Sequence, residues 1–180
     1  MANEEREQSR DGLASAKAVN EAAKEPCRIA DVLVDDVTWR WATRPRRAEW
    51  LQAIAELCEE GEVEADAQSP LRIYVTVKSD SILSLFHDPR GAEVGRLELP
   101  RPIIAPVFRE YMALLTSIGA QGAEGYSPQV EALDIARRLV HNDAADLLMR
   151  HSTGLLPSHK TARRLFTLFV ILTHDTTKMI

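Results

Sequence analysis

The chain has 180 residues, of which 45% are hydrophobic and 27% are charged, a length and a mixture typical of a soluble globular domain. Lys and Arg total 22 against 27 Asp and Glu, so the formal net charge is −5 at pH 7. An acidic chain is a poor match for a protein whose whole surface binds nucleic acid, but it leaves room for a local basic patch. The longest apolar stretch, residues 165–172, is much shorter than the about 20 residues that cross a bilayer as a helix.

The first 26 residues form a segment apart, rich in charged and small side chains and without any aromatic residue. Such a segment buries too little apolar surface to offset the entropy of ordering, so we expect a disordered tail over residues 1–26. It also lacks the apolar core of a secretory signal, which predicts a cytoplasmic protein. In that reducing compartment Cys27 and Cys58 are expected to be free thiols.

The following residues predict one strand and one helix. Branched residues indicate a strand over residues 28–36. A basic, irregular linker over 39–47 leads into a helix over 46–60, where Gly61 is a plausible end. Residues 62–69 are acidic and poorly periodic, so we expect a loop there.

Three strands and three helices are predicted over the rest of the chain. Strands at 72–77, 82–87 and 93–99 are joined by links too short for parallel crossovers, which predicts an antiparallel meander. Helices are expected near 102–117, 128–149 and 159–173, the second with Ser127 as its N-cap. The last helix, capped by Ser158, is apolar nearly all round and is placed at the centre.

This order predicts an α+β fold: an approximately four-stranded, mostly antiparallel sheet backed by about four helices. The expected boundaries are a disordered tail over residues 1–26, a single domain over residues 27–176 and a C-terminal tail over residues 177–180.

Polar side chains concentrate on the last two helices. The candidate ligand-binding residues are Asp134, Arg137, Arg138, His141, Asn142, Arg163 and Arg164. Asp134 is spaced to pair with both Arg137 and Arg138 along one helix. In one interpretation these charges are an ordinary solvated ladder on a helix surface. In the other, the arginines, His141 and Asn142 converge on an anionic ligand.

A second candidate is the basic linker, where indoles alternate with arginines. Its candidate nucleic-acid contacts are Trp39, Arg40, Trp41, Arg44 and Arg47. Aromatic rings can stack on bases while guanidinium groups neutralise phosphates. The competing interpretation is that the indoles anchor the core and the arginine stems cover apolar surface.

Motifs for other chemistry are absent from the sequence. The five histidines and two cysteines have no metal-ligand spacing, and no glycine-rich phosphate loop or nucleophile elbow occurs. We therefore predict no metal, no cofactor and no catalytic residue.

Three runs in the C-terminal half resemble a known family. The runs S-P-Q-V-E-A-L-D-I-A-R-R, then H-N-D, and T-A-R-R-L-F-T-L, which begin at Ser127, His141 and Thr161, are similar to uncharacterised protein family 0262 of small bacterial proteins. Residues 28–36 resemble the opening strand of that family, and Tyr111 falls where the family carries a tyrosine. The resemblance implies family membership for most of the chain and supplies no reaction, substrate or cofactor.

The leading hypothesis is a small cytosolic binding or regulatory protein, rather than an enzyme, that recognises an acidic protein or a small anionic ligand through its Arg/His/Asn face. One alternative is an enzyme that acts on a phosphorylated substrate, with His141 as general acid or base and the arginines as a phosphate clamp. Another is RNA or ribosome contact through residues 39–47, which predicts binding that weakens steeply with salt.

Overall fold

A computed structural model describes residues 25–121 and 128–173. Residues 1–24, 122–127 and 174–180 lie outside this description, so the expected tails, apart from Glu25 and Pro26, and the expected cap at Ser127 lie outside it too. The strands are β1 Cys27–Val34, β2 Glu62–Ala65, β3 Leu71–Val77, β4 Ser81–His87, β5 Glu93–Pro100, β6 Ser152–Thr153 and β7 Leu155–Pro157. The helices are α2 Asp36–Trp41, α3 Arg44–Glu60, α4 Arg101–Gln121, α5 Pro128–Arg150 and α6 His159–Thr173.

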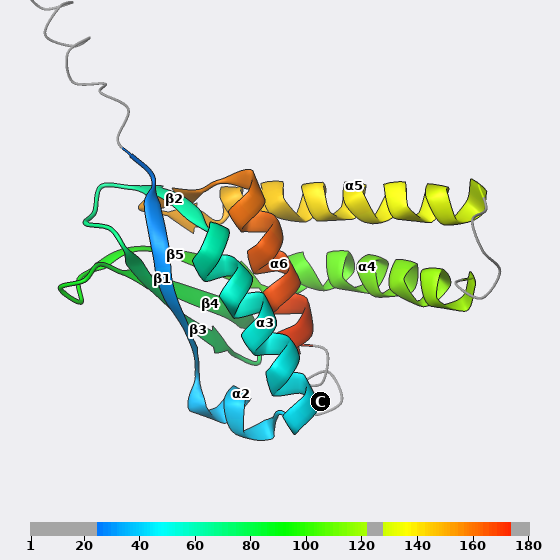
Figure 1. Cartoon of the computed structure of the whole chain (residues 1–180), viewed down its shortest axis with the longest axis horizontal. Helices are drawn as coiled ribbons and strands as arrows, with labels where there is room; N and C mark the ends of the chain where they lie inside the picture. Colours follow the sequence, from blue (N-terminus) through cyan, green and yellow to red (C-terminus); the bar gives the residue numbers. More distant parts are fainter. Residues whose placement is uncertain (1–24, 122–127, 174–180) are drawn as a thin grey trace, which may run out of the picture.

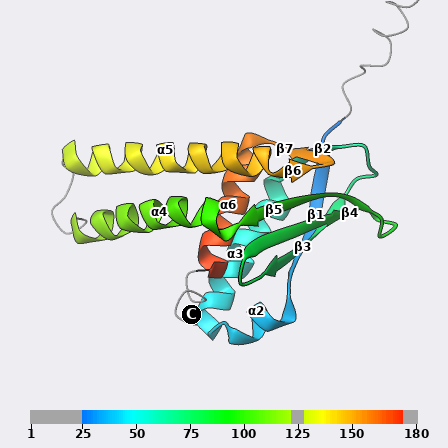
Figure 2. The same cartoon turned by 180° about the vertical axis from the view of Figure 1, so that it is seen from behind.

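The strands form one mixed sheet in the order β6-β5-β4-β3-β1-β2-β7. Its two end strands, β6 and β7, are separated in the chain by Gly154 alone, so the sheet is nearly closed and barrel-like (Figures 1 and 2). Gly154 has φ +77°, and a Cβ atom there would lie 2.8 Å from the carbonyl oxygen of Val94. A residue without a side chain is therefore required where the sheet turns back on itself.

The expectation of a four-stranded sheet with about four helices is wrong, although the fold is α+β. The described residues hold seven strands and five helices. The strands missed, β2, β6 and β7, have four, two and three residues, too few for an alternating pattern to be distinguished from a loop. The pairing of β1 with β3 is parallel, whereas the remaining pairs are antiparallel.

Most of the predicted basic linker is also regular structure, because α2 extends to Trp41 and α3 begins at Arg44. Asp35 caps α2: the Asp35 carboxylate accepts hydrogen bonds from the Thr38 backbone at 2.9 Å and the Thr38 hydroxyl at 2.6 Å. The same carboxylate accepts from the Val77 backbone at 3.3 Å. One side chain therefore joins the end of β1, the start of α2 and the end of β3.

Helix α6 is central, as its composition predicts. Nine of its residues are buried, and it packs between α3 and α5 (Figure 1). Its first turn is capped as expected, because the Ser158 hydroxyl accepts a hydrogen bond from the Thr161 backbone at 3.2 Å. Gly61 ends α3, also as expected.

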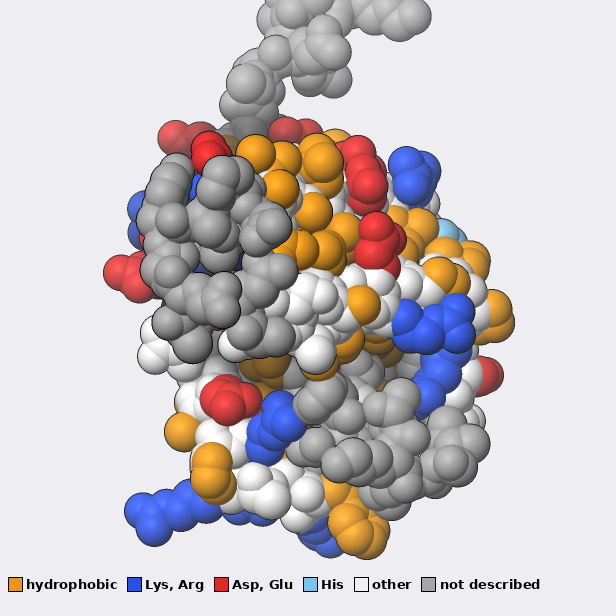
Figure 3. All heavy atoms as spheres, turned by 90° about the vertical axis from the view of Figure 1, so that its right-hand side faces the viewer, with side chains coloured by type: hydrophobic (Ala, Val, Ile, Leu, Met, Phe, Trp, Pro, Cys, Tyr) orange, Lys and Arg blue, Asp and Glu red, His pale blue; other side chains and the backbone are white. Residues whose placement is uncertain are grey.

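Helices α4 and α5 lie side by side and extend away from the sheet in both views (Figures 1 and 2). Figure 3 views the molecule from the far ends of these helices and shows hydrophobic side chains at the surface at the level of α5. Ile135 and Leu139 of α5 are more than half exposed. Over the described ranges, no helix combines the length and hydropathy of a membrane span.

Candidate functional site

A cavity of about 330 Å³ lies where α6 begins beside α5. It is lined by His141, His159, Lys160, Arg163, Arg164 and Thr167. Three of these six side chains are lysine or arginine and two are histidine, so the cavity is lined mainly by basic side chains; it is called the cationic cavity below. The fold thus brings together three of the predicted ligand-binding residues: His141, Arg163 and Arg164.

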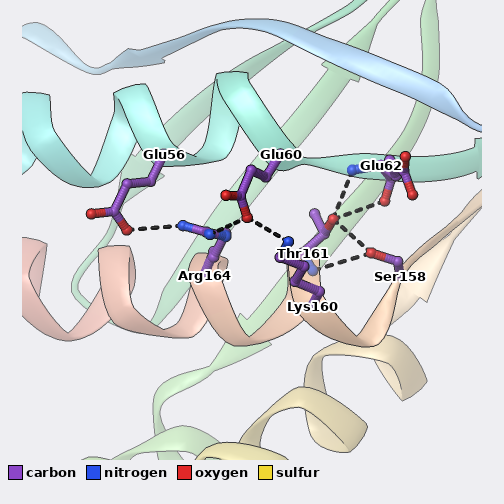
Figure 4. Close-up of polar contacts among 7 residues, drawn as sticks. All are labelled: Glu56, Glu60, Glu62, Ser158, Lys160, Thr161 and Arg164. Carbon is purple, nitrogen blue, oxygen red and sulfur yellow. Dashed lines mark hydrogen bonds and ion pairs between the residues drawn. The ribbon is translucent and has the colours of Figure 1, made fainter.

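The start of α6 is held in place by hydrogen bonds to β2 (Figure 4). The buried Thr161 hydroxyl donates to the Glu62 carbonyl at 2.9 Å and accepts from the Glu62 backbone N–H at 2.8 Å. The Ser158 hydroxyl lies 2.8 Å from the Thr161 hydroxyl and completes the network. These bonds fix the first turn of α6, and with it the positions of the basic side chains that follow.

Arg164 is already neutralised by α3. Its guanidinium group contacts the Glu56 carboxylate at 2.9 Å and also bonds the Glu60 carboxylate (Figure 4). Lys160 approaches the same Glu60 carboxylate at 2.5 Å. Hydrogen bonds from Lys160 and then from Arg164 lower the pKa of Glu60. On this side of α6, Lys160 and Arg164 are therefore engaged in ion pairs with α3.

Charged side chains of α5 that lie on the N-terminal side of His141 also form ion pairs. Asp134 accepts from Arg137 at 2.6 Å and from Arg138 at 2.7 Å. The Arg137 hydrogen bond is the largest cause of the lowered pKa of Asp134. These three residues do not line the cavity, nor does Asn142, whose Oδ1 is buried without a hydrogen-bond partner among the described residues.

Arg163 differs from the other arginines of this group. It is half-buried, it lines the cavity, and it forms no ion pair with any residue the structure describes. A cation that is partly withdrawn from water and lacks a carboxylate partner has a favourable interaction left to make with an anion.

His141 borders the cavity but belongs to an aromatic cluster. Its ring packs edge-to-face with Tyr111 at 4.8 Å and with Phe166 at 5.3 Å between centroids. Burial, and then the charges of Arg163 and Arg137, lower the pKa of His141 to about 4. The imidazole is therefore neutral at physiological pH, and its Nδ1 is buried without a partner among the described residues.

Motif reasoning missed four residues of this region: His159 and Lys160 in the lining, and Tyr111 and Phe166 around His141. The signal for His159 was available, because it precedes Arg163 by four residues and shares its helix face. His159 also lies 3.6 Å from Asp146 of α5. The packing of Tyr111 comes from α4, which no spacing along α5 or α6 reveals.

The second candidate region is partly used by the fold. Trp39 packs against Trp50 at 5.8 Å, and the Arg47 guanidinium lies 5.7 Å from the Trp39 ring. The Arg47 Nε also donates to the Trp39 carbonyl at 3.3 Å. Arg40, Trp41 and Arg44 remain exposed. Nucleic-acid binding here stays a prediction, with two of its five side chains engaged in internal contacts.

No group of three or more His, Cys, Asp or Glu side chains suited to holding a metal occurs within residues 25–121 and 128–173. The chemistry that this geometry offers is recognition of negative charge.

Comparison with known proteins identifies relatives over most of the chain. The profile of the uncharacterised protein family UPF0262 matches residues 26–175. UPF0262 proteins of Novosphingobium aromaticivorans and Erythrobacter litoralis are each 30% identical, over 161 and 152 residues, covering 81% of this chain and 95% of theirs. One from Acidiphilium cryptum is 30% identical over 150 residues, covering 81% of this chain and 91% of its own. No solved structure matches the chain.

Proposed function

This chain belongs to the uncharacterised protein family UPF0262, whose name assigns no reaction, and from its cationic cavity we propose that it is a binding protein for a small anionic ligand. The observation that carries this proposal is Arg163, a half-buried guanidinium in a cavity lined by basic side chains and without a carboxylate partner among the described residues.

The chemistry of the lining fits a phosphate or carboxylate group. Guanidinium presents planar paired donors to either group, and hydrogen bonds to charged partners are stronger than neutral ones. Lys160 adds a cation in the first turn of α6, and the N-terminal end of a helix favours negative charge. The neighbouring Glu60 already shares its carboxylate with Lys160 and Arg164. Arg163 is therefore the residue on which we expect anion binding to depend.

The two alternative functions have less support. A histidine acid or base works best with a pKa near the operating pH, whereas the pKa of His141 is lowered to about 4. RNA contact through residues 39–47 would compete with the packing of Trp39 against Trp50 and with the Arg47–Trp39 contacts. A binding protein remains the function that the geometry supports best.

The test is a calorimetric titration of the full chain with inorganic phosphate and, in parallel, with a hexaglutamate peptide. We expect Arg163→Gln to weaken binding of the preferred anion at least about tenfold, the loss of one charge-assisted contact. Arg138→Gln is the matched control, because it removes the same charge from α5 outside the cavity.

The relative affinities of phosphate and hexaglutamate distinguish a phosphorylated ligand from a carboxylate-rich one. Equal weakening by both variants would mean that the anions respond only to overall charge. That result, or no binding of either anion by the unaltered chain, would refute the proposal.

A further inference from the structure

A second cavity, of about 410 Å³, lies between α4, the start of β4 and the C-terminal end of α6. Its lining is Ile82, Arg101, Ile104, Ala105, Phe108, Arg109, Met112, Val170 and Thr173. The cationic cavity lies at the other end of α6 and is lined by six different residues, so the two cavities share no residue. This cavity is independent of the proposed function.

The cavity follows one face of α4. From Arg101 to Met112, the lining residues of that helix follow the i, i+3, i+4, i+7 spacing of a single helical stripe. Ile82, Ile104 and Val170 are buried and form an apolar floor. Ala105 contributes only a methyl group in the middle of the stripe, which leaves space that a larger side chain would fill.

The charged members of the lining are both cationic. Arg101 donates to the Lys78 carbonyl at 3.4 Å, and Arg109 is exposed. Neither forms an ion pair with a residue in the described part of the chain. Their eight-residue separation corresponds to about 12 Å along the helix axis. An extended apolar surface is thus bordered by two guanidinium groups without carboxylate partners.

The complementary ligand has an extended apolar body and an anionic head. We propose that this cavity binds a straight-chain aliphatic carboxylate, such as a medium-chain fatty acid, with its hydrocarbon on the Ile104–Phe108 face and its carboxylate at Arg109. The volume lies within the usual range for small-ligand sites, which are mostly apolar with a few placed polar groups. Arg101 already donates to a carbonyl, so it makes the smaller contribution.

The test is calorimetric titration of the full chain with hexanoate, octanoate and decanoate. Affinity is expected to rise about threefold to fourfold for each added methylene, as burial of hydrocarbon requires. 1-Decanol, which lacks the charge, is expected to bind at least about tenfold more weakly than decanoate.

Two variants test the assigned contacts. Arg109→Gln is expected to weaken decanoate binding at least about tenfold, whereas Arg90→Gln, in the exposed turn between β4 and β5, is expected to leave it unchanged. Ala105→Leu places a larger side chain in the cavity and is expected to weaken decanoate and decanol together. If Arg109→Gln and Arg90→Gln have equal effects, or if affinity does not depend on chain length, the proposal is wrong.

Two other occupants would also overturn it. If residues 174–180, which follow Thr173, fill the cavity, then replacing Met179 and Ile180 by serine in the full chain would strengthen decanoate binding at least about tenfold. If a second copy of the chain covers it, light scattering would show a dimer that decanoate dissociates. Binding by a monomer that is unaffected by the serine replacements is the supporting result.

Discussion

Helix α6 packs between α3 and α5, and two consecutive arginines of α6, Arg163 and Arg164, differ in whether a carboxylate neutralises them. On the α3 side, Arg164 is bonded by the Glu56 and Glu60 carboxylates. Arg163 lines the same cavity as Arg164, beside His141 of α5, but has no carboxylate partner among the described residues. Successive side chains of a helix point about 100° apart. Two consecutive arginines can therefore face different neighbours, so that Arg164 forms ion pairs within the protein while Arg163 is available to bind an anion.

The same contrast holds for the hydroxyl groups of α6. Thr161 is buried and ties the helix to β2 through both its donor and its acceptor. Thr167 lines the cavity, and among the described residues its hydroxyl bonds only the Arg163 carbonyl of its own helix. The α3–β2 side of α6 thus carries bonds that join it to other elements, whereas Arg163 and Thr167 make no side-chain bond to another element within the described residues.

The largest effect is expected from breaking the link between α6 and β2. Thr161→Val keeps the size of the side chain but leaves the Glu62 N–H without its acceptor and removes one of the two contacts of the Ser158 hydroxyl. We expect the free energy of unfolding to fall by about 2–3 kcal/mol, because part-buried hydrogen bonds between α6 and β2 are lost and the Glu62 N–H has no other partner among the described residues. Urea denaturation measures it.

Thr167→Val is the matched control on the other side of α6, and we expect a loss of less than about 0.5 kcal/mol because its hydroxyl makes only a local bond within the helix. Equal losses for the two variants would contradict the division of α6 into a structural side and a binding side.

A smaller effect, specific to pH, is expected at His141. Its folded pKa of about 4 lies below the ordinary value of 6.5, so the unfolded chain binds a proton that the folded chain does not. Stability from this group is therefore complete above pH 6.5 and is lost as the pH falls toward 4. We expect His141→Phe, which keeps an aromatic ring beside Tyr111 and Phe166, to reduce the loss between pH 7 and pH 4.5 by about 2 kcal/mol.

Thermal unfolding of both proteins across this range checks the prediction. Asp134 and Glu60, whose pKa values are lowered, add their own acid sensitivity to both proteins alike. Parallel stability curves for the two proteins would show that His141 is not held neutral by its surroundings.

The sequence predicted the elements with long, periodic patterns. The nearly all-apolar composition of residues 165–172 indicated the central position of α6, and the alternation in residues 72–77 indicated β3. The short strands β2, β6 and β7 were not predicted, because their pairing depends on the turn at Gly154 and on partners distant in the sequence rather than on a local pattern. The parallel pairing of β1 with β3 likewise depends on the intervening helices.

The candidate site was predicted in part. Pairing of Asp134 with Arg137 and Arg138 follows from helical spacing. The partners of Arg164, by contrast, precede it by more than one hundred residues, so no spacing argument distinguishes Arg164 from Arg163. Only the packing of α3 and α5 around α6 shows which arginine is neutralised.

The most direct test of this distinction is the pKa of His141, measured by NMR titration of its imidazole in the unaltered chain, in Arg163→Gln and in Arg164→Gln. The charge of Arg163 lowers this pKa, so Arg163→Gln is expected to raise it from about 4. Addition of phosphate to the unaltered chain is expected to raise it in the same direction, and Arg164→Gln to leave it nearly unchanged. Equal shifts in both variants, or no response to phosphate, would contradict the proposal that Arg163, which has no carboxylate partner among the described residues, binds an anion in this cavity.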